Sequence, residues 1–318
     1  MKKAIFILAL IGAGIAAQAQ QDPQYTMYMF NQLAINPAYA GSRECLSATA
    51  LYRTQWTGID GAPKTLSFGI HSPLNNERIA LGLEVTNDQL GVTNTTNVSG
   101  IYAYRLPVTK KSKLSIGLQA TITSYLNNLS QVATAASGTP DQVFANNTNL
   151  LLPNFGAGLY WYSQRGYLGM TVPHLLDNNL ESRSYAAINT VNAKQFRHLF
   201  LMAGYMFPLS DVIKFKPSTM VKYAPNSPVE TDLNGSLLFY DALTLGVSWR
   251  SDLSSLRDKL TESTDFMVIY DINQMLRIGV AFDLTITQLN GYNNGTYEFM
   301  IGYDFRHKMD RMLTPRYF

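Results

Sequence analysis

The residues of this sequence that are able to do chemistry are charged side chains placed at every second position of apolar runs. Lys214, Lys216 and Lys222 share one parity of such a run, and large apolar residues take the other. A charge on the lipid face of a membrane strand costs about 2 to 4 kcal/mol near the bilayer midplane, so these side chains should face a lumen. The full set of expected lumen-facing charges is Glu84, Lys214, Lys216, Lys222, Arg250, Arg277, Asp283, Glu298, Asp304 and Arg306.

Two arrangements of these charges are open. They line a conducting pore, or they pair with one another across a filled lumen, and their mixed signs predict no ion selectivity. The histidines offer little more: His174 and His198 lie in or beside a long predicted loop, where an outer-rim hydrolase would need them, but no spacing to Ser or Asp is diagnostic. No nucleophile elbow, phosphate loop or dinucleotide fingerprint is present. We predict no enzyme activity, no metal and no cofactor.

Residues 1–19 have the form of a secretory signal. Lys2 and Lys3 precede an apolar run, and Ala17-Gln18-Ala19 supplies a small-residue cleavage site before Gln20. No later stretch approaches the roughly 18 apolar residues that a membrane helix needs. Cys45 is the only cysteine, which excludes an internal disulfide and a cysteine-rich metal site.

The composition is typical of a membrane barrel. Charged residues make up 15% of the chain, against about 25% in a typical soluble domain. The mean hydropathy is −0.05, as expected when apolar and small polar residues alternate along strands. The net charge of +3 is spread along the chain without a basic patch, so we predict no nucleic-acid partner.

The elements that must position the charges are strand-like runs separated by Gly, Pro, Asn and Asp clusters. We count about fourteen, an even number as in bacterial outer-membrane barrels. The predicted runs are 43–55, 64–72, 78–87, 95–106, 112–127, 153–163, 165–173, 196–207, 211–223, 230–240, 242–250, 263–271, 274–287 and 296–306.

The loops between these runs alternate between short and long. The short set is 72–77, 107–111, 164, 209–210, 241 and 272–273. The long set is 57–63, 88–94, 128–152, 174–194, 225–229, 251–262 and 288–295. A soluble sandwich has no reason to keep that order, whereas outer-membrane barrels have short periplasmic turns and long extracellular loops. We therefore predict an all-β fold, a transmembrane antiparallel β-barrel whose last strand pairs with its first.

The facing of two strands stays open, and the aromatic residues are a less specific signal. The runs near Val98–Arg105 and Leu199–Phe207 fit either phase of inward and outward residues. Aromatic residues near strand ends suit the interfacial girdles of a membrane barrel. The expected girdle residues are Tyr52, Trp56, Tyr160, Trp161, Tyr162, Tyr240 and Trp249.

The segment before the first strand is rich in aromatic and amide side chains, and Asn36-Pro37 breaks any helix there. This segment and the run Tyr52–Thr65 resemble the two N-terminal blocks of the PorP/SprF family of Bacteroidota, which is associated with type IX secretion and gliding motility. The residues that carry the resemblance are Gln24, Tyr25, Asn31, Asn36, Pro37, Ala38, Tyr39 and Gly41 in the first block and Arg53, Gln55, Trp56, Gly61, Ala62 and Pro63 in the second.

The resemblance implies an outer-membrane barrel that is not an enzyme. It would partner or anchor secreted surface proteins that bear a type B C-terminal sorting domain, and it would contact periplasmic components bound to peptidoglycan. A transport channel for small solutes is the alternative function. The expected organisation is a signal peptide (1–19), an N-terminal periplasmic or plug-like segment (20–42), an outer-membrane barrel (43–306) and a C-terminal periplasmic tail (307–318). Residues Tyr25–Gly41 are expected at the periplasmic mouth or in the lumen, with a loose periplasmic tail as the alternative.

Overall fold

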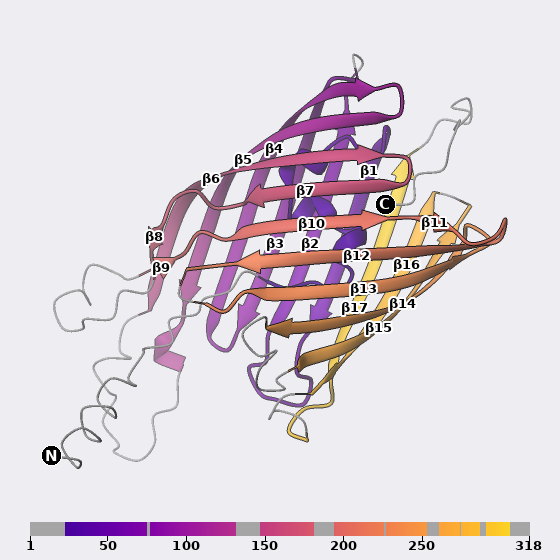
Figure 1. The fold of residues 1–318 in the computed structure, drawn as a ribbon. Coiled ribbons are helices and arrows are strands. Elements are labelled where there is room, and N and C mark those ends of the chain that lie inside the picture. The colour runs from indigo at the N-terminus through magenta and orange to yellow at the C-terminus, as the bar shows by residue number, and fades with distance from the viewer. Residues whose placement is uncertain are drawn as a thin grey trace, which may run out of the picture.

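The strands form a closed antiparallel barrel in the computed structural model, which describes residues 23–74, 77–131, 147–180, 194–225, 227–252, 261–273, 275–286 and 291–305 (Figure 1). The strands are β1 (Leu46–Thr54), β2 (Lys64–Pro73), β3 (Ile79–Leu90), β4 (Thr93–Thr109), β5 (Ser112–Asn127), β6 (Thr148–Ser163), β7 (Gly166–Val172), β8 (Asn178–Asn179), β9 (Lys194–Gln195), β10 (Leu199–Tyr205), β11 (Phe207–Pro208), β12 (Ile213–Tyr223), β13 (Glu230–Phe239), β14 (Leu243–Asp252), β15 (Thr261–Ile272), β16 (Leu276–Thr285) and β17 (Thr296–Phe305). Strands β8 and β9 form a separate small ladder, and β11 continues β10 beside β12. The wall therefore has fourteen strands, as predicted.

The barrel closes between its first and last strands. Leu46 of β1 is opposite Phe305 of β17, and the ladder runs without a break to Thr54 and Tyr297. Strand β10 pairs with β12, which completes the ring on the other side. No sheet edge remains along these ladders, which is the condition for a sheet to sit in lipid.

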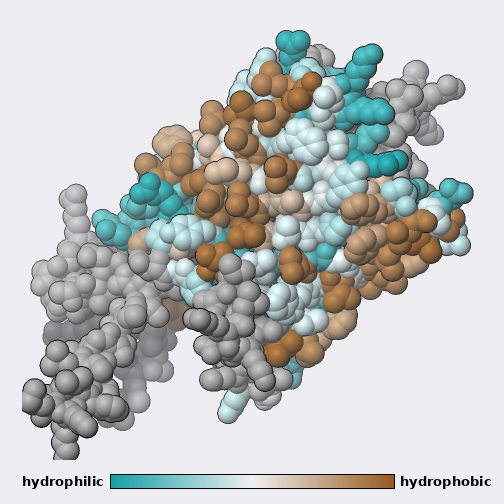
Figure 2. All heavy atoms as spheres, viewed as in Figure 1, coloured by the Kyte–Doolittle hydropathy of each residue, from teal (hydrophilic) through white to brown (hydrophobic). Residues whose placement is uncertain are grey.

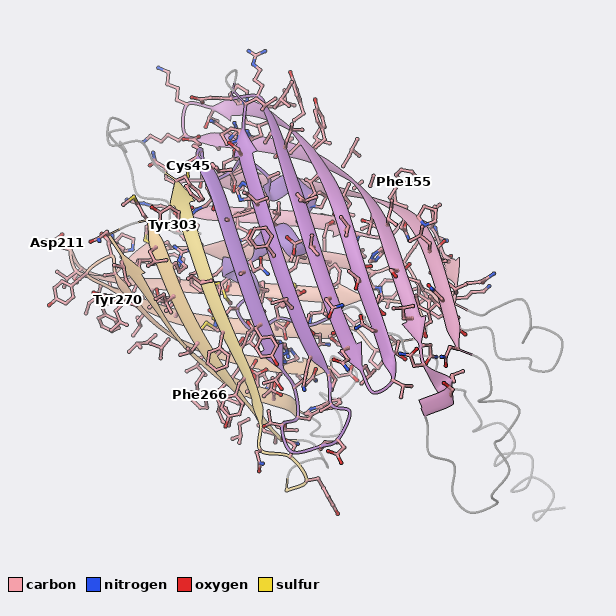
Figure 3. All side chains as sticks on the ribbon, turned by 180° about the vertical axis from the view of Figure 1, so that it is seen from behind. Cys45, Phe155, Asp211, Phe266, Tyr270 and Tyr303 are labelled. Atoms are coloured by element: carbon pink, nitrogen blue, oxygen red, sulfur yellow. The ribbon has the colours of Figure 1, made fainter. Side chains whose placement is uncertain are left out.

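Alternate residues of each strand face lipid and lumen. In β16, Ile278, Val280 and Leu284 are exposed, while Ala281 and Asp283 between them are buried. Phe155, Phe266 and Tyr270 project from the outside of the wall in Figure 3, and apolar residues cover much of the side wall in Figure 2. In water such an apolar surface would be unfavourable, whereas against lipid tails it is the expected surface.

The structure shows which residues face lipid and which face the lumen in the two strands that the sequence left undecided. In β4, Val98 and Tyr102 face outward, and Ser99 and Arg105 are buried on the lumen side. In β10, Leu201 and Tyr205 face outward, and Phe200 and Met202 are buried. The expected girdle was wrong for Tyr160 and Tyr162, which point into the lumen, whereas Trp161 between them is exposed.

Short turns connect the strands at the periplasmic end. At one of them the N–H of Ala242 donates to the carbonyl of Phe239 at 3.0 Å, and the two central residues of this β-turn, Tyr240 and Asp241, have positive φ angles of 52° and 54°, as a type I′ turn requires. One predicted outer loop is absent: β3 and β4 extend to Leu90 and Thr93, so the expected loop 88–94 is a turn at Gly91. Regular ladder pairing continued past the point where the Asn- and Thr-rich sequence suggested a loop.

The lumen is occupied by the N-terminal segment. Residues 23–42, here called the plug, contain three short 3-10 helices, η1 (Tyr28–Phe30), η2 (Gln32–Ala34) and η3 (Pro37–Tyr39), which lie inside the wall in Figure 1. A fourth, η4 (Leu129–Gln131), lies at an outer loop. No helix within the described ranges is long and apolar enough to cross a membrane.

Candidate functional site: the plug and the recesses on its two sides

The plug is the core of the molecule. Met27, Tyr28, Ala38 and Ala40 are fully buried, and the polar side chain of Asn36 is fully buried with them. The chain runs from the extracellular half of the lumen at Pro23 down to the periplasmic end, where it enters β1. The described part of this segment therefore lies inside the barrel and not on its periplasmic surface.

The upper end of the plug is attached to a network of buried charges. The backbone N–H groups of Thr26 and Met27 donate to the two carboxylate oxygens of Glu298, at 2.9 and 2.7 Å. The Thr26 hydroxyl donates to Asp283 at 2.7 Å. Arg53 donates to the Thr26 hydroxyl and forms ion pairs with Glu298 at 3.0 Å and Asp283 at 2.8 Å. Arg53 thus pairs with both carboxylates while these groups fix the plug backbone.

This network continues around the wall as an outer charge belt. Its members are Arg53, Lys222, Glu230, Asp232, Arg250, Asp265, Asp283 and Glu298. Arg250 pairs with Asp232 at 2.6 Å, and Lys222 approaches Asp232 at 3.1 Å. Asp265 and Asp283 are direct cross-strand neighbours, an arrangement of like charges that is unfavourable without the two arginines beside them.

The lower half of the plug rests on glycines of the wall. Gly117 and Gly158 are cross-strand partners in β5 and β6. A Cβ atom on Gly158 would lie 2.1 Å from Oδ1 of Asn36, and one on Gly117 would lie 2.1 Å from the backbone nitrogen of Ala38. Only glycine permits this approach, which lets the Asn36 amide donate to the carbonyl of Leu159 at 3.0 Å.

The plug turns into β1 at Gly41, whose φ of 75° favours glycine. Its N–H donates to Nδ1 of His71 at 3.0 Å, and Arg105 donates to its carbonyl oxygen at 2.5 Å. Tyr39 packs edge-on against His71 and against Tyr160, with centroid distances of 5.4 and 5.5 Å. His71 therefore has a structural role in holding this turn.

The ring of Phe30 contacts two cations on the periplasmic side. Nζ of Lys216 is 4.8 Å from the centre of its ring, and Cζ of Arg277 is 5.1 Å from it. Arg277 also pairs with Asp271 at 2.7 Å. The aromatic ring therefore attracts both positive charges.

The two blocks of family-like residues meet in space. The second block begins at Arg53, which contacts the plug, and continues as the first outer loop. The N–H of Gln55 donates to the carbonyl of Pro63 at 2.9 Å, and that of Trp56 donates to Thr296 at 3.1 Å. Gly61 has a φ of 74°, and its carbonyl accepts from Gly91 of the next outer turn at 2.8 Å. Plug and outer loop are thus joined through one arginine.

The expected lumen charges within the described residues lie on the inward parity of their strands. Glu84, Lys216, Lys222, Arg250, Asp283, Glu298 and Asp304 are buried. Lys214 pairs with Asp241 at the periplasmic end, and Arg277 is half-buried. Arg306 lies outside the described residues, as do the signal peptide, its cleavage site and the tail 307–318.

The sequence analysis did not identify several other residues that hold the plug or carry buried charge in the lumen. Asp232, Asp265 and Arg105 are buried lumen charges, and Gly117 and Gly158 form the floor under the plug. Asp265 shares the inward parity of its strand with Ser263 and Met267, so the alternation of β15 held a signal for it. The glycines had no such signal, because small residues fit the inner face of any barrel strand.

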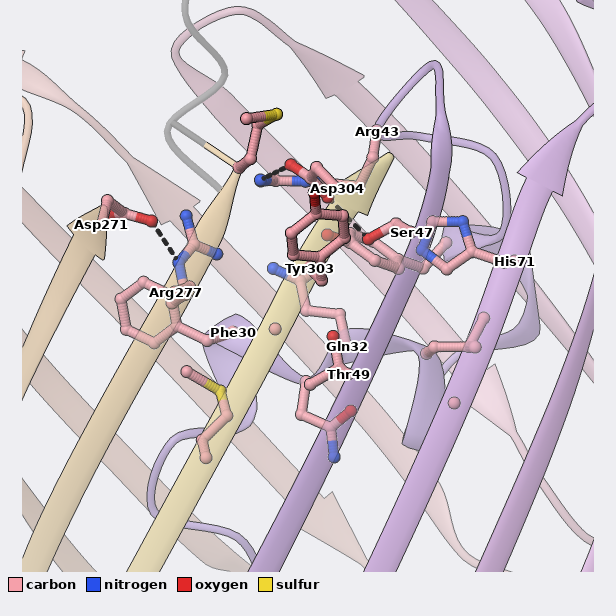
Figure 4. A pocket seen from close by; sticks show the side chains of 17 residues that line it. Phe30, Gln32, Arg43, Ser47, Thr49, His71, Asp271, Arg277, Tyr303 and Asp304 are labelled. Atoms are coloured by element: carbon pink, nitrogen blue, oxygen red, sulfur yellow. Dashed lines mark hydrogen bonds and ion pairs between the residues drawn. The ribbon is translucent and has the colours of Figure 1, made fainter. Parts of the chain in front are cut away.

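The plug divides the lumen between two recesses. The periplasmic recess, shown in Figure 4, has an empty volume of ≈ 520 Å³ together with the solvent open to it, and it contains two ion pairs, Arg43 with Asp304 at 2.6 Å and Arg277 with Asp271. The outer recess, again with its open solvent, has an empty volume of ≈ 760 Å³. Tyr25 lines the outer recess, where burial, together with the Glu84 carboxylate, raises the pKa of its phenol well above the usual range.

The two histidines in or beside the long predicted loop are both buried. His174 lines the outer recess, and His198 stacks on Phe200 with a centroid distance of 6.0 Å. No group of three or more metal-ligating side chains occurs in the described parts of the chain. The site is a filled lumen with a recess on each side.

The fold has one counterpart of note, and further similar chains, among solved structures. Among solved structures, the chain is similar to the CymD monoaromatic hydrocarbon channel, with 14% identity, a TM-score of 0.50 and coverage of 87% of this chain and 93% of that one. A FadL homologue of Pseudomonas aeruginosa has 13% identity, a TM-score of 0.46 and coverage of 91% and 96%. Omp33 of Acinetobacter baumannii has 12% identity, a TM-score of 0.41 and coverage of 82% and 99%. At these identities the likeness concerns the fold alone.

The sequence has no significant match among curated proteins. The family model described as type IX secretion system membrane protein PorP/SprF matches residues 17–303, which is most of the chain. This match spans both N-terminal blocks and nearly the whole barrel, and it confirms the family indicated by the sequence. The chain therefore belongs to the PorP/SprF family of type IX secretion system membrane proteins, as an outer-membrane β-barrel.

Proposed function

We propose that this protein is a non-enzymatic partner or anchor for a secreted surface protein that bears a type B sorting domain. The observation that carries the proposal is the filled lumen. Most of the plug is buried, and it is attached to the wall at both ends, by Glu298 above and by His71 and Arg105 below. A barrel closed in this way is suited to holding a partner at its surface.

The two ends of the barrel have separate roles in this proposal. The outer loops and outer recess face the secreted protein. The short turns and the periplasmic recess, with its Arg43 and Arg277 pairs, face a periplasmic component of the type IX machinery or one bound to peptidoglycan. The N-terminal segment connects these two ends through the lumen.

The test is deletion of the gene in its own bacterium, followed by measurement of the secreted protein on cells and in medium. We expect loss of surface attachment, restored by the wild-type gene. Affinity purification of the barrel from outer membranes should recover the surface protein together with a periplasmic component. Recovery of general porins alone would contradict the proposal.

The alternative, a transport channel for small solutes, makes a different prediction. It requires the plug to leave its contacts, so liposomes containing the purified protein would take up a small sugar or aromatic acid. We expect no flux above that of empty liposomes. Flux with normal surface attachment in the deletion strain would favour the channel.

A further inference from the structure

The outer recess contains a carboxylate without a cationic partner. Glu84 of β3 is buried with 6% of its surface exposed. Its Oε1 accepts a hydrogen bond from Ser67 at 2.8 Å, and Thr86 lies beside the carboxyl group, while Oε2 is buried without a hydrogen bond of good geometry among the described residues. A buried carboxylate is costly unless a charge or several donors satisfy it. Glu84 lines the recess, so a ligand there is able to supply the missing partner.

The cation across the recess does not serve this purpose. Lys222 also lines the recess, but it is engaged with Glu230 at 3.6 Å and Asp232 at 3.1 Å. Across the outer half of the lumen the charges are unequal. Among the described residues there, six buried acidic side chains, Glu84, Glu230, Asp232, Asp265, Asp283 and Glu298, accompany three buried basic side chains, Arg53, Lys222 and Arg250. This excess of acidic groups favours a positively charged ligand.

The rest of the recess is amphipathic. Leu33 and Ile35 of the plug and Phe200 and Met220 of the wall supply apolar surface. Hydroxyl and amide groups supply hydrogen-bonding partners on the opposite side, from Thr86, Asn97, Ser99, Gln119 and Thr121. The combination of an apolar wall, several polar groups and one charge is typical of a specific ligand site. It suits a lysine or arginine side chain, which has an apolar stem and a charged end.

We propose that the outer recess binds a segment of the secreted surface protein by placing a lysine or arginine side chain against Glu84. Aliphatic residues beside that cation lie on Leu33, Ile35 and Phe200, and backbone amides of the segment meet the polar side of the recess. This inference rests on the proposed function and identifies where the partner is recognised and by which chemistry.

The experiment uses the full mature protein in lipid nanodiscs and fluorescence polarisation. The probe is a fluorescein-labelled peptide, Gly-Leu-Lys-Leu-Lys-Leu-Gly, compared with the same peptide acetylated at both lysines. We expect the charged peptide to bind about tenfold tighter or more, because a charge-assisted contact in a buried site is lost on acetylation. Its affinity should fall as salt is raised.

Glu84→Gln keeps the size of the side chain and its bond to Ser67, and it should abolish the preference for the charged peptide. The matched control is Glu77→Gln, which changes an exposed carboxylate at a periplasmic turn and should leave binding unchanged. Asn97→Trp, which fills the recess without removing a charge, should weaken both peptides. Heat-modifiable mobility on gels verifies that each variant forms a barrel.

Two outcomes would overturn the inference. One is equal binding of charged and acetylated peptides, and the other is displacement of the charged peptide by spermidine at similar affinity, which would mark a site for small amines. In cells, Glu84→Gln should reduce surface attachment, while Glu77→Gln should not. Attachment that is lost on deletion but unaffected by Glu84→Gln would reject the recess and keep the proposed function. Attachment unaffected by deletion would reject that function, whatever the peptides do.

Discussion

The two ends of the plug are held by different kinds of contact. At the outer end, Thr26 and Met27 are fixed by Glu298, Asp283 and Arg53 through charges that are almost completely buried. At the inner end, the segment Asn36–Ala38 is fixed by close approach to a glycine floor. The outer contact depends on every charge keeping its partner. The inner contact depends on the absence of side-chain atoms, so the two ends should respond to opposite kinds of substitution.

The largest effect should come from removing the central cation of the outer end. Arg53→Met leaves Asp283 and Glu298 buried without their ion pair, and loss of one partner of a buried pair costs about 3 to 5 kcal/mol. We expect the free energy of unfolding in urea, measured in lipid vesicles, to fall by that amount. Arg197→Met removes an exposed pair with Asp177 and should cost at most about 1 kcal/mol. Equal losses in the two variants would contradict the buried network.

The next effect tests the glycine floor. Gly158→Val places side-chain atoms where Asn36 lies, and overpacking of this kind costs about 1 to 3 kcal/mol. Chymotrypsin should then cleave at the plug tyrosines, which the wild-type barrel protects. Gly100→Val is the control, because a Cβ there meets nothing within 4 Å. Protection of the plug in both variants would show that the floor is not needed.

A smaller effect is expected between the two ends, at Phe30. Phe30→Leu keeps an apolar side chain but removes the ring that faces Lys216 and Arg277, a loss of about 0.5 to 2 kcal/mol. The measurement is again urea unfolding, compared with Phe299→Leu, which changes an exposed residue on the lipid side. If Phe299→Leu proved the more destabilising of the two, the contacts of Phe30 with the two cations would make no net contribution to the free energy of unfolding.

The smallest effect should follow loss of a single neutral hydrogen bond. The Tyr28 hydroxyl donates to Ser218 across 3.4 Å, a long contact, and Ser218 also contacts Asn234. Tyr28→Phe should therefore change the free energy of unfolding by less than about 1 kcal/mol. A loss as large as that of Arg53→Met would show that hydroxyl contacts, and not the charge belt, dominate the attachment.

Much of the fold could be predicted because the alternation of apolar and polar residues in a barrel strand indicates which side chains face lipid and which face the lumen. Each strand such as β16 or β17 has one apolar and one polar parity, so local sequence specifies both its existence and its two faces. The turn at Gly91 was predicted as a loop, because pairing with a neighbouring strand overrode the loop-like composition of residues 88–94. Tyr160 and Tyr162 were misplaced because an aromatic ring suits a girdle and a filled lumen equally well.

The sequence by itself determined the fourteen-strand alternation, the inward direction of charges such as Glu84 and Glu298, and the two family-like blocks. Only the tertiary structure decided that the lumen is filled, that Arg53 joins the two blocks, and that Glu84 lines a recess without an ion pair of its own among the described residues. The physical reason is distance along the chain. Alternation is a property of neighbouring residues, whereas Thr26 and Glu298 are 272 positions apart. Such partners are chosen when the barrel closes around the plug.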